Sequence, residues 1–374
     1  MLIVTVKGSH TMPTKKTGGI FTRDPAIDSS SFKLLIALIA VTLVLLLVLA
    51  CAGCSALLSI DFLGKLNGVL PSGGNSDNPF YEKNEIDIPF DLENAATISA
   101  DSINSERALL VDVTADKIVA SKKNGGNPMI YPASLTKIMT LIVVVENLKS
   151  ESDLDHVLTI EDEPGEHSGF GFKIGEKLTV RDLIYATILY SDGLACLTLA
   201  KYIAGSEAAF VKLMNQKVKD LGLLEGDPET NPSTNFINCT GLHDTYHYST
   251  SYDMAVITAY AMENTLCSSV FNSLSYKPSS NFRPGEGPFT FWHQVFAKRL
   301  NYGEKQPNNA EILGTKSGWT GRESGYCMAY YIKGDDGHYY VLITSNATET
   351  QSATGWDNAI NDAFYICDTY INAN

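Results

Sequence analysis

The sequence is short of positive charge. It holds 28 Lys and Arg residues against 42 Asp and Glu residues, which gives a net charge of −14. The deficit is uneven, because residues 1–33 carry five basic and two acidic side chains (+3) and the rest of the chain therefore carries −17. Such an acidic surface repels phosphate backbones, so nucleic acid is not an expected partner.

Cysteine is also scarce and irregularly placed. Two of the seven cysteines, Cys51 and Cys54, fall in one apolar run, and the others are Cys196, Cys239, Cys267, Cys327 and Cys367. An odd number at scattered spacings is neither a disulfide framework nor a zinc-ligand pattern, so the sequence predicts no metal ion and no cofactor. We expect most of these thiols to be small buried side chains, and a single disulfide stays open as an alternative.

Charge is absent from one long segment. Residues 34–60 contain no charged side chain, and the first sixteen of them are almost all Leu, Ile, Val or Ala. This is long enough to cross a hydrocarbon core of about 30 Å, and we expect a transmembrane helix over residues 34–56. Basic residues before it and acidic ones after it predict a cytoplasmic tail (1–33) and an external domain. A cleaved signal peptide, or a lipoprotein signal ending at Cys51 or Cys54, remains an alternative with the same outside location.

The remaining chain divides into a linker and one domain. Residues 57–105 include the turn-rich stretch 71–79 and are expected to be an extracellular linker. From residue 106 to 374 the pattern is that of a folded domain. It predicts a hairpin (107–113 and 117–121), helices (134–148, 180–190, 194–203, 207–221 and 250–264), strands (312–316, 326–333 and 339–344) and a last helix (356–371). This order predicts an α+β domain whose sheet joins both ends of the chain.

The first chemical motif is Ser134-Leu135-Thr136-Lys137 on a predicted helix. A spacing of three residues puts the hydroxyl and the amine on one helix face, so the amine can take the hydroxyl proton once its pKa is lowered. The N-terminus of the helix also offers backbone N–H groups to an oxyanion. The same spacing of Ser30 and Lys33 in the predicted tail shows that this pattern is weak on its own.

Two further motifs follow. Lys316-Ser317-Gly318 lies on a predicted strand and offers a cation and a hydroxyl to a carboxylate, while the glycine allows a close approach of the substrate backbone. A similar triplet, residues 16–18, lies in the predicted tail. Ser191-Asp192-Gly193 falls at a turn between two predicted helices, in the position of a Ser-x-Asn element whose serine relays a proton.

The order and flanks of the motifs make them specific. Ser-x-x-Lys, Ser-x-x and Lys-Ser-Gly follow one another as in penicillin-binding proteins and class A β-lactamases. Segments 132–140, 241–244, 248–255, 314–320 and 325–327 resemble the D-alanyl-D-alanine carboxypeptidase family. The resemblance implies a β-lactamase/transpeptidase-like domain, with an antiparallel sheet flanked by helices and a helical subdomain. It also implies a serine-type carboxypeptidase that removes the terminal D-Ala from peptidoglycan stem peptides and is inhibited by β-lactams.

The resemblance also implies roles for single residues. Ser134 would attack the carbonyl of the penultimate D-Ala, Lys137 would act as the base, and Ser191 would pass the proton to the departing D-Ala. The remaining roles concern substrate binding: Lys316 and Ser317 for the terminal carboxylate, Gly318 and Gly193 beside the substrate backbone, and the N–H groups of Ser134 and Trp319 for the oxyanion.

Three departures from the family pattern are visible. Gly193 stands where the family has Asn, so water or Asp192 replaces the missing amide, or the activity is poor. A weakly active or non-catalytic wall-binding protein is therefore one alternative. Residues 225–232 read as an insertion, and the chain ends soon after its last predicted helix, where many relatives carry a β-rich domain. A β-lactamase is the other alternative, because residues 227–231 echo a Glu-Pro-Glu-x-Asn segment, although we interpret them as a surface loop.

Other polar features have simpler readings. His243 and His247 lack a third ligand for a metal, and the acidic residues near position 163 form a solvated run. Gly169 and Gly171 are not followed by a helix, which argues against a nucleotide site. We expect Trp319 to line the site.

Overall fold

The structure is a computed structural model that describes residues 86–122, 127–162, 168–223 and 234–372. The predicted tail, the predicted transmembrane helix, most of the predicted linker and residues 225–232 lie outside these ranges. Within them, no single helix has the length and hydropathy of a membrane span. One pair of helices, Gly193–Ala204 and Glu207–Asp220, meets that test together but is bent by 84°.

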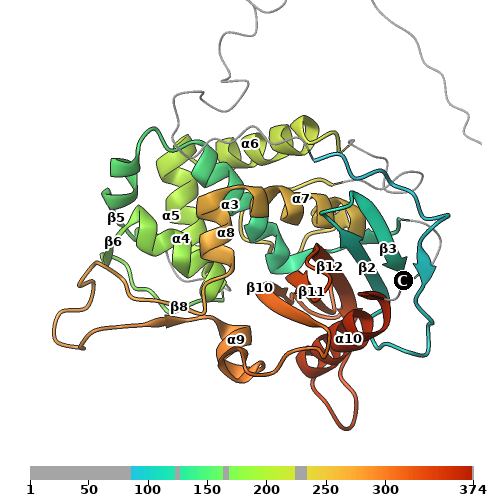
Figure 1. Ribbon diagram of the computed structural model, residues 1–374. Coiled ribbons are helices and arrows are strands. Elements are labelled where there is room, and N and C mark those ends of the chain that lie inside the picture. The colour runs from blue at the N-terminus through green and yellow to red at the C-terminus, as the bar shows by residue number, and fades with distance from the viewer. Residues whose placement is uncertain (1–85, 123–126, 163–167, 224–233, 373–374) are drawn as a thin grey trace, which may run out of the picture. The chain divides into compact units, whose positions relative to one another are not determined.

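A six-stranded sheet is the centre of the domain (Figure 1), and its order is β1-β3-β2-β12-β11-β10. All neighbours are antiparallel except β1 and β3. The strands are β1 (Ala96–Thr97), β2 (Arg107–Asp112), β3 (Lys117–Ser121), β10 (Ala310–Gly318), β11 (Tyr326–Gly334) and β12 (Tyr339–Ala347). Short pairs outside it join β4 (Met129–Ile130) to β7 (Ser249–Thr250), β5 (Val157–Thr159) to β6 (Lys177–Thr179), and β8 (Ser275–Tyr276) to β9 (Phe291–Trp292).

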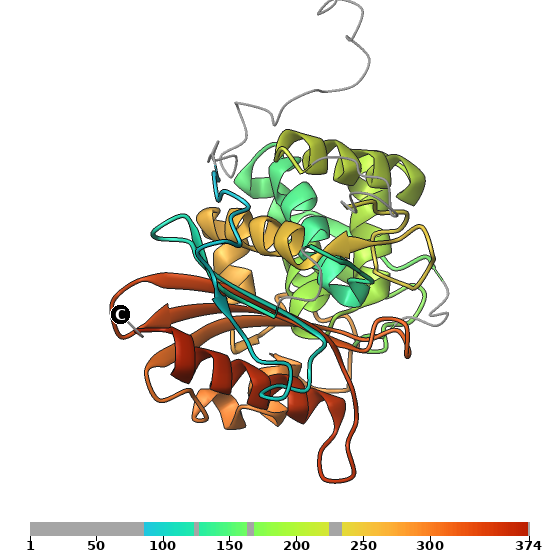
Figure 2. The same ribbon diagram turned by 90° about the vertical axis from the view of Figure 1, so that its right-hand side faces the viewer.

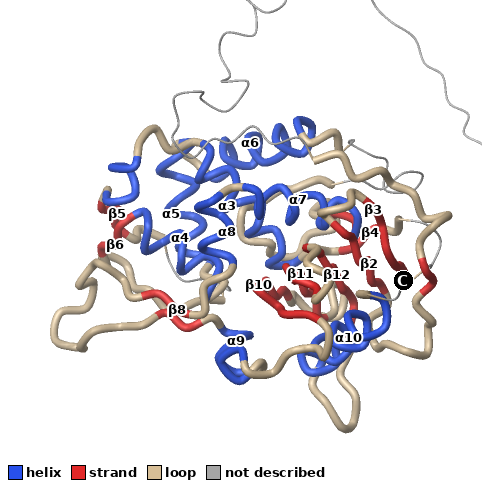
Figure 3. Tube along the Cα trace, in the orientation of Figure 1, coloured by secondary structure: helices blue, strands red, loops and turns tan. Residues whose placement is uncertain are grey.

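The helices lie mostly between β3 and β10 in the sequence, and Figure 3 shows most of them gathered to one side of the strands. They are α3 (Thr136–Glu146), α4 (Val180–Leu189), α5 (Gly193–Ala204), α6 (Glu207–Asp220), α7 (Ser251–Glu263), α8 (Thr265–Phe271), α9 (Gln294–Lys298) and α10 (Gly355–Tyr370), with the 3₁₀ turns η1 (Ala133–Leu135), η2 (Glu151–Asp155) and η3 (Asn301–Gly303).

Side-chain caps explain where several helices begin. Thr179 with Asp182 forms a capping box at α4, and Thr354 with Asp357 forms one at α10. Asp192 caps α5 by accepting a hydrogen bond from the backbone of Ala195.

The sheet is covered on both faces. Figure 2 shows α10 against one face and α7 against the other, with most of the remaining helices beyond α7. A hydrophobic cluster that includes Leu110, Tyr330 and Ile366 lies between the sheet and α10. The short helix α9 packs in the cluster on the α10 face through Val295 and Phe296. A larger hydrophobic cluster lies between the sheet and α7 and extends through the helical part. The predicted α+β class and the helical subdomain are confirmed.

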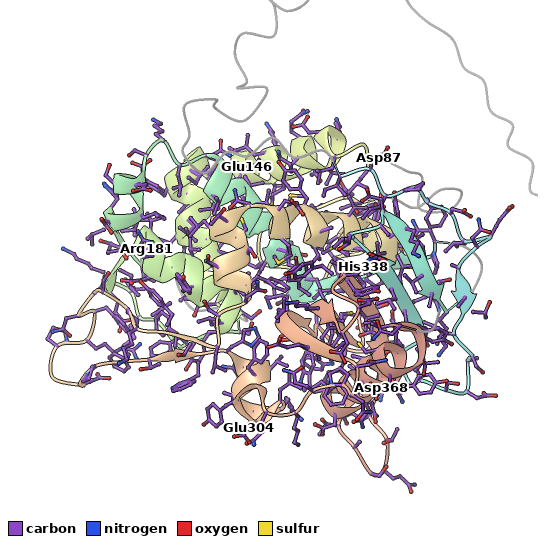
Figure 4. The ribbon with its side chains drawn as sticks, viewed as in Figure 1. Asp87, Glu146, Arg181, Glu304, His338 and Asp368 are labelled. Atoms are coloured by element: carbon purple, nitrogen blue, oxygen red, sulfur yellow. The ribbon has the colours of Figure 1, made fainter. Side chains whose placement is uncertain are left out.

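A buried ion pair fixes α3 within the helical part. Lys217 Nζ lies 2.6 Å from Glu146 Oε2, and the Tyr260 hydroxyl donates to Glu146 Oε1 at 2.6 Å. Glu146 lies among the helices in Figure 4, far along α3 from the serine at its start. The contact ties α3 to α6 and α7, so the C-terminal end of the helix that bears Lys137 is held in place.

Residues 86–105 are packed against the domain. Ile88 and Ile98 are buried, β1 pairs with β3, and the Tyr252 hydroxyl donates to Ile88 O at 2.6 Å. The packed domain therefore begins before Glu106, where the sequence pattern places its start. The apolar residues of this segment are isolated among polar ones, so the sequence has no periodic hydrophobic pattern here from which their burial could be predicted.

Candidate active site

Ser134 and Lys137 lie together at the start of α3. Ser134 belongs to the 3₁₀ turn η1, and Lys137 is in the first turn of the helix that continues it. Lys137 Nζ is 2.9 Å from Ser134 Oγ, which is within hydrogen-bond reach. The predicted pairing of hydroxyl and amine is thus present in the structure.

A backbone carbonyl completes the surroundings of the lysine. Lys137 Nζ donates to Thr240 O at 2.5 Å, and Thr240 sits in a loop held by Asn238 Oδ1, which accepts from Gly241 N at 2.7 Å. Burial lowers the pKa of Lys137 from its usual value, against smaller raising effects of Cys196, Cys239 and Asp192. A lysine that loses its proton more easily is better suited to act as a base.

The loop that contains Gly241 comes very close to Ser134. Gly241 has φ = +83°, and a Cβ built on it would lie 1.9 Å from Ala133 O and 2.9 Å from Ser134 N. Ala133 itself has φ = 47°, a left-handed conformation that is uncommon for a residue with a side chain. Only glycine fits at position 241, because any side chain would displace the backbone beside Ser134.

Ser191 and Lys316 form a second pair across the cleft. Lys316 Nζ donates to Ser191 Oγ at 2.9 Å and to Ser317 O at 2.7 Å. Ser191 is held in a left-handed conformation (φ = 56°), just before α5. Burial and the charge of Lys137 lower the pKa of Lys316 well below its usual value. The two amines are therefore close enough to influence one another.

Asp192 does not replace the side-chain amide that Gly193 lacks. Its carboxylate accepts from Ala195 N and from Phe170 N, each at 2.8 Å, and no hydrogen bond joins it to Lys137 in the described part of the chain. Burial raises its pKa. Asp192 instead fastens the loop at residues 168–170 to the serine turn, and Gly193 N donates to Ser168 O at 3.0 Å in the same contact.

The two pairs open onto one cleft of about 400 Å³. Its lining includes Ser134, Ser191, Ser317, Gly318 and Trp319 from the sequence prediction, while Gly193 and both lysines are buried behind it. A Cβ on Gly318 would lie 2.8 Å from Ser134 N, so β10 passes directly beside Ser134. The Trp319 side chain is 53% exposed and lines the cleft as expected.

Other lining residues were not predicted. Gln294, Val295, Lys298 and Arg299 come from α9 and the residue after it, and Trp356 comes from α10. His293 caps α9 and its Nε2 lies 2.9 Å from Thr315 O, which attaches the helix to β10. No motif in the sequence marks this short helix as part of the site.

His247 supports the segment that contains Ser134 through a contact with Thr136. It is buried, its Nε2 lies 2.8 Å from Thr136 Oγ1, and Ile237 N donates to its Nδ1 at 3.2 Å. Burial lowers the pKa of His247 to about 3, so the ring is neutral. A neutral ring that accepts at Nδ1 carries its proton on Nε2 and donates it to Thr136.

The remaining sequence features have structural roles or lie in undescribed residues. No group of three His, Cys, Asp or Glu side chains suited to a metal occurs among the described residues. Five cysteines, at positions 196, 239, 267, 327 and 367, are buried, as most were expected to be. Gly169 packs on Asp192, where a Cβ would lie 2.1 Å from Oδ2. The segment that echoes a β-lactamase motif lies outside the described residues.

Comparison with known proteins agrees with this geometry. The profile of peptidase S11, D-alanyl-D-alanine carboxypeptidase, matches residues 94–340. The chain belongs to this family. The match includes all three motifs of the cleft, and it begins ahead of the hairpin at β2 and β3.

Curated relatives match over part of their length. The chain is 33% identical to D-alanyl-D-alanine carboxypeptidase DacF of Bacillus subtilis over 41% of this chain and 38% of that one. It is 34% identical to D-alanyl-D-alanine carboxypeptidase DacC of Escherichia coli over 43% of this chain and 40% of that one. It thus spans about two fifths of the length of these relatives.

Solved structures share the fold. The D-alanyl-D-alanine carboxypeptidase of Mycobacterium tuberculosis H37Rv has a TM-score of 0.58 at 21% identity, covering 74% of this chain and 95% of that one. Penicillin binding protein 5 of Haemophilus influenzae has a TM-score of 0.58 at 22% identity, covering 72% of each chain.

Proposed function

We propose that the protein is a serine D-alanyl-D-alanine carboxypeptidase that removes the terminal D-Ala from peptidoglycan stem peptides. One observation carries the proposal. Lys137 Nζ lies 2.9 Å from Ser134 Oγ, in a cleft that also holds the Ser191–Lys316 pair. Membership of the peptidase S11 family supports the same reaction.

Acylation begins with the first pair. With its pKa lowered by burial, Lys137 in its amine form accepts the Ser134 hydroxyl proton while one of its N–H groups stays bonded to Thr240 O. Ser134 Oγ then attacks the carbonyl of the penultimate D-Ala. The backbone N–H groups of Ser134 and Trp319 are the proposed donors to the resulting oxyanion.

The second pair serves the leaving group. Ser191 Oγ, hydrogen-bonded to Lys316 Nζ at 2.9 Å, gives its proton to the nitrogen of the departing D-Ala as the peptide bond breaks. The proton that Lys137 took from Ser134 restores the Ser191 hydroxyl. A water molecule then hydrolyses the ester on Ser134, which releases the shortened peptide and regenerates the serine.

Benzylpenicillin provides the direct test, because a serine that attacks D-Ala-D-Ala also attacks the lactam carbonyl. We expect the intact mass to rise by one opened penicillin, and peptide mapping to place it on Ser134. Ser134→Ala is expected to take no label and to release no D-Ala from a D-Ala-D-Ala peptide. Label on another residue, or label that persists in Ser134→Ala, would contradict the assignment.

Gly193 favours a second candidate, a weakly active protein that mainly binds the cell wall. The position lacks a side-chain amide, and Asp192 is bonded to backbone N–H groups instead of to Lys137. Such a protein would bind peptidoglycan fragments without forming an acyl-enzyme. A third outcome, rapid loss of the penicillin label with turnover of the lactam, would identify a β-lactamase.

We also propose that the domain is held outside the cell by a single N-terminal transmembrane helix. The uncharged run at residues 34–60, with basic residues before it and acidic ones after it, supports this location. Protease added to intact cells is expected to remove the domain and to spare residues 1–33. Protection of the domain in intact cells would contradict it.

A further inference from the structure

Two large aromatic side chains are exposed beside the cleft. Trp292 is 40% exposed and Tyr302 is 56% exposed. Trp292 comes just before the residue that caps α9, and Tyr302 lies in the turn η3 that follows α9. Since α9 lines the cleft through Gln294, Val295 and Lys298, the two rings flank an element of the candidate active site without lining the cleft themselves.

The two rings form a corner. Their centroids are 5.3 Å apart and their planes meet at 81°. In this edge-to-face arrangement one ring stands on the face of the other, so a free ring face and the uncovered part of the second face lie nearly at a right angle. Exposed rings that contact each other form a patch, and such patches mark binding surfaces more often than single exposed residues do.

The backbone fixes the direction of Trp292. Trp292 pairs with Ser275 in the β8–β9 ladder, and the next residue, His293, donates from its backbone N to Leu274 O at 2.9 Å. Phe291 and His293, on either side of Trp292, are both buried. Because successive side chains of a strand point to opposite faces, the indole of Trp292 is directed outward.

A strained turn holds Tyr302 outward. Tyr302 has φ = 59° and Asn301 before it has φ = 45°, a left-handed conformation that is uncommon for residues with bulky side chains. The turn is nevertheless well bonded, because Gly303 N and Lys305 N both donate to O of the buried Leu300, at 2.9 Å and 3.1 Å. Strain of this kind persists where the surroundings fix it, and it clusters at ligand-binding sites.

The residues around the two rings are polar. Lys298, Asn301, Glu304 and Lys305 are exposed, and Glu304 lies beside α9 in Figure 4. A specific protein partner needs about 800 Å² on each side, which two rings bordered by charge do not offer as an apolar surface. The patch fits a smaller ligand with an apolar face and a polar rim. A sugar ring has this chemistry, since its faces carry C–H groups and its edge carries hydroxyl and acetamide groups.

We propose that Trp292 and Tyr302 bind a glycan strand of peptidoglycan by stacking on the faces of its N-acetylated sugars. The inference rests on the proposed function, because stem peptides project from such strands and a cleft that holds a stem peptide lies close to glycan. The aromatic pair then keeps the enzyme on its polymeric substrate, while the cleft acts on the peptide.

The test uses a ligand that has the sugars but no peptide. The β-1,4-linked tetramer of N-acetylglucosamine is titrated into the full-length protein, and binding is followed by calorimetry. Tyr302→Asn removes one ring, and Asn tolerates the left-handed conformation better than most residues. Trp292→Thr removes the other ring and keeps a residue that suits a strand, while Trp292→Phe keeps a ring. Tyr246→Asn is the matched control, because Tyr246 is 71% exposed and lies outside the cleft lining.

We expect Tyr302→Asn and Trp292→Thr each to raise the dissociation constant of the tetramer about tenfold. Trp292→Phe should raise it less, and Tyr246→Asn should leave it unchanged. The urea midpoint of Tyr302→Asn should equal or exceed that of the unmodified protein, because the strain at position 302 is relieved. Release of D-Ala from isolated cell walls should fall in Tyr302→Asn, whereas kcat/KM for a soluble D-Ala-D-Ala peptide should not change.

Absence of tetramer binding by the unmodified protein, or equal binding by Tyr302→Asn, would overturn the inference. A dimer in sedimentation velocity that the same substitutions dissociate would also overturn it, because the rings would then join two copies of the chain. Failure of the proposed function would look different. In that case the unmodified protein would release no D-Ala and take no penicillin label on Ser134, whereas the affinity for the tetramer is measured independently of both.

Discussion

Gly241→Ala tests whether the loop at residues 238–241 positions Ser134, the proposed nucleophile. The new Cβ would lie 1.9 Å from Ala133 O and 2.4 Å from Ala133 C, and real Cβ atoms do not approach other atoms within 3.0 Å. Either the loop or the backbone ahead of Ser134 must therefore move by more than about 1 Å. A misplacement of about 1 Å at a reacting group costs on the order of 100-fold in rate.

The matched control is Gly337→Ala in the turn between β11 and β12. Gly337 has φ = +86°, close to the +83° of Gly241, but nothing lies within 4 Å of its added Cβ. Both variants carry the same conformational strain, about 1–2 kcal/mol for a left-handed Ala. The steric clash is the only large difference between them.

Two measurements separate strain from misplacement. The rate of acylation by benzylpenicillin, followed by intact mass, should fall about 100-fold in Gly241→Ala and stay unchanged in Gly337→Ala. Urea denaturation should show that the free energy of unfolding falls by about 1–2 kcal/mol in Gly337→Ala and by more in Gly241→Ala. Wild-type acylation by a folded Gly241→Ala would refute the argument, and so would equal rate losses in both variants.

Gly193→Asn is expected to accelerate acylation about 5- to 150-fold, the value of one recovered hydrogen bond in the transition state. Gly193 is the first residue of α5 and so has helical backbone angles that Asn tolerates. A folded Gly193→Asn variant that is acylated no faster would show that the side-chain amide is not needed. Acylation should also rise with pH until Lys137 loses its proton, at a pH below the usual lysine value because burial lowers its pKa. A rate independent of pH between about 5 and 9, or unaffected by Lys137→Ala, would argue against a lysine base. Burial alone would raise the pKa of Asp182, but hydrogen bonds from Ser280, Ser279 and Tyr276 outweigh it and lower the pKa. The stability that Asp182 contributes is then full above its unfolded pKa of about 3.9 and is lost as pH falls through the lower folded pKa. Asp182→Asn should therefore lower the free energy of unfolding by about 1–3 kcal/mol at neutral pH and by less in acid. Equal urea midpoints of the variant and the unmodified protein at neutral pH would contradict this.

The elements that could be predicted are those with a strong local signal. β10, β11 and β12 were expected from apolar β-rich runs, and α4 and α10 begin at Thr-x-x-Asp capping boxes that are visible in the sequence. Ser134 and Lys137 were predictable as a pair because three residues on a helix fix their separation.

The contacts that could not be predicted join residues far apart in the chain. Thr240 O receives a hydrogen bond from Lys137, 103 positions earlier, and a carbonyl oxygen carries no residue-specific signal. The helix α9 lines the cleft because His293 bonds to Thr315 O, and no hydrophobic periodicity in the sequence predicts this contact. The sequence leaves Asp192 open as a substitute for the missing amide, yet Asp192 caps α5, since a buried carboxylate at a helix N-terminus satisfies backbone N–H groups first.

The pairing of β2 with β12 has a consequence for biosynthesis. Residues 107–112 of β2 pair with residues 340–345 of β12. One edge of β2 therefore stays unpaired until the entire helical part has been synthesised. Contacts of such long sequence separation form slowly. Ser134 and Lys137 meet early, within one helical turn, but β10 brings Lys316 to Ser191 only near the end. The last strands of the sheet thus also complete the proposed catalytic centre, and a chain released before residue 316 would have the Ser134–Lys137 pair without the lysine that bonds to Ser191.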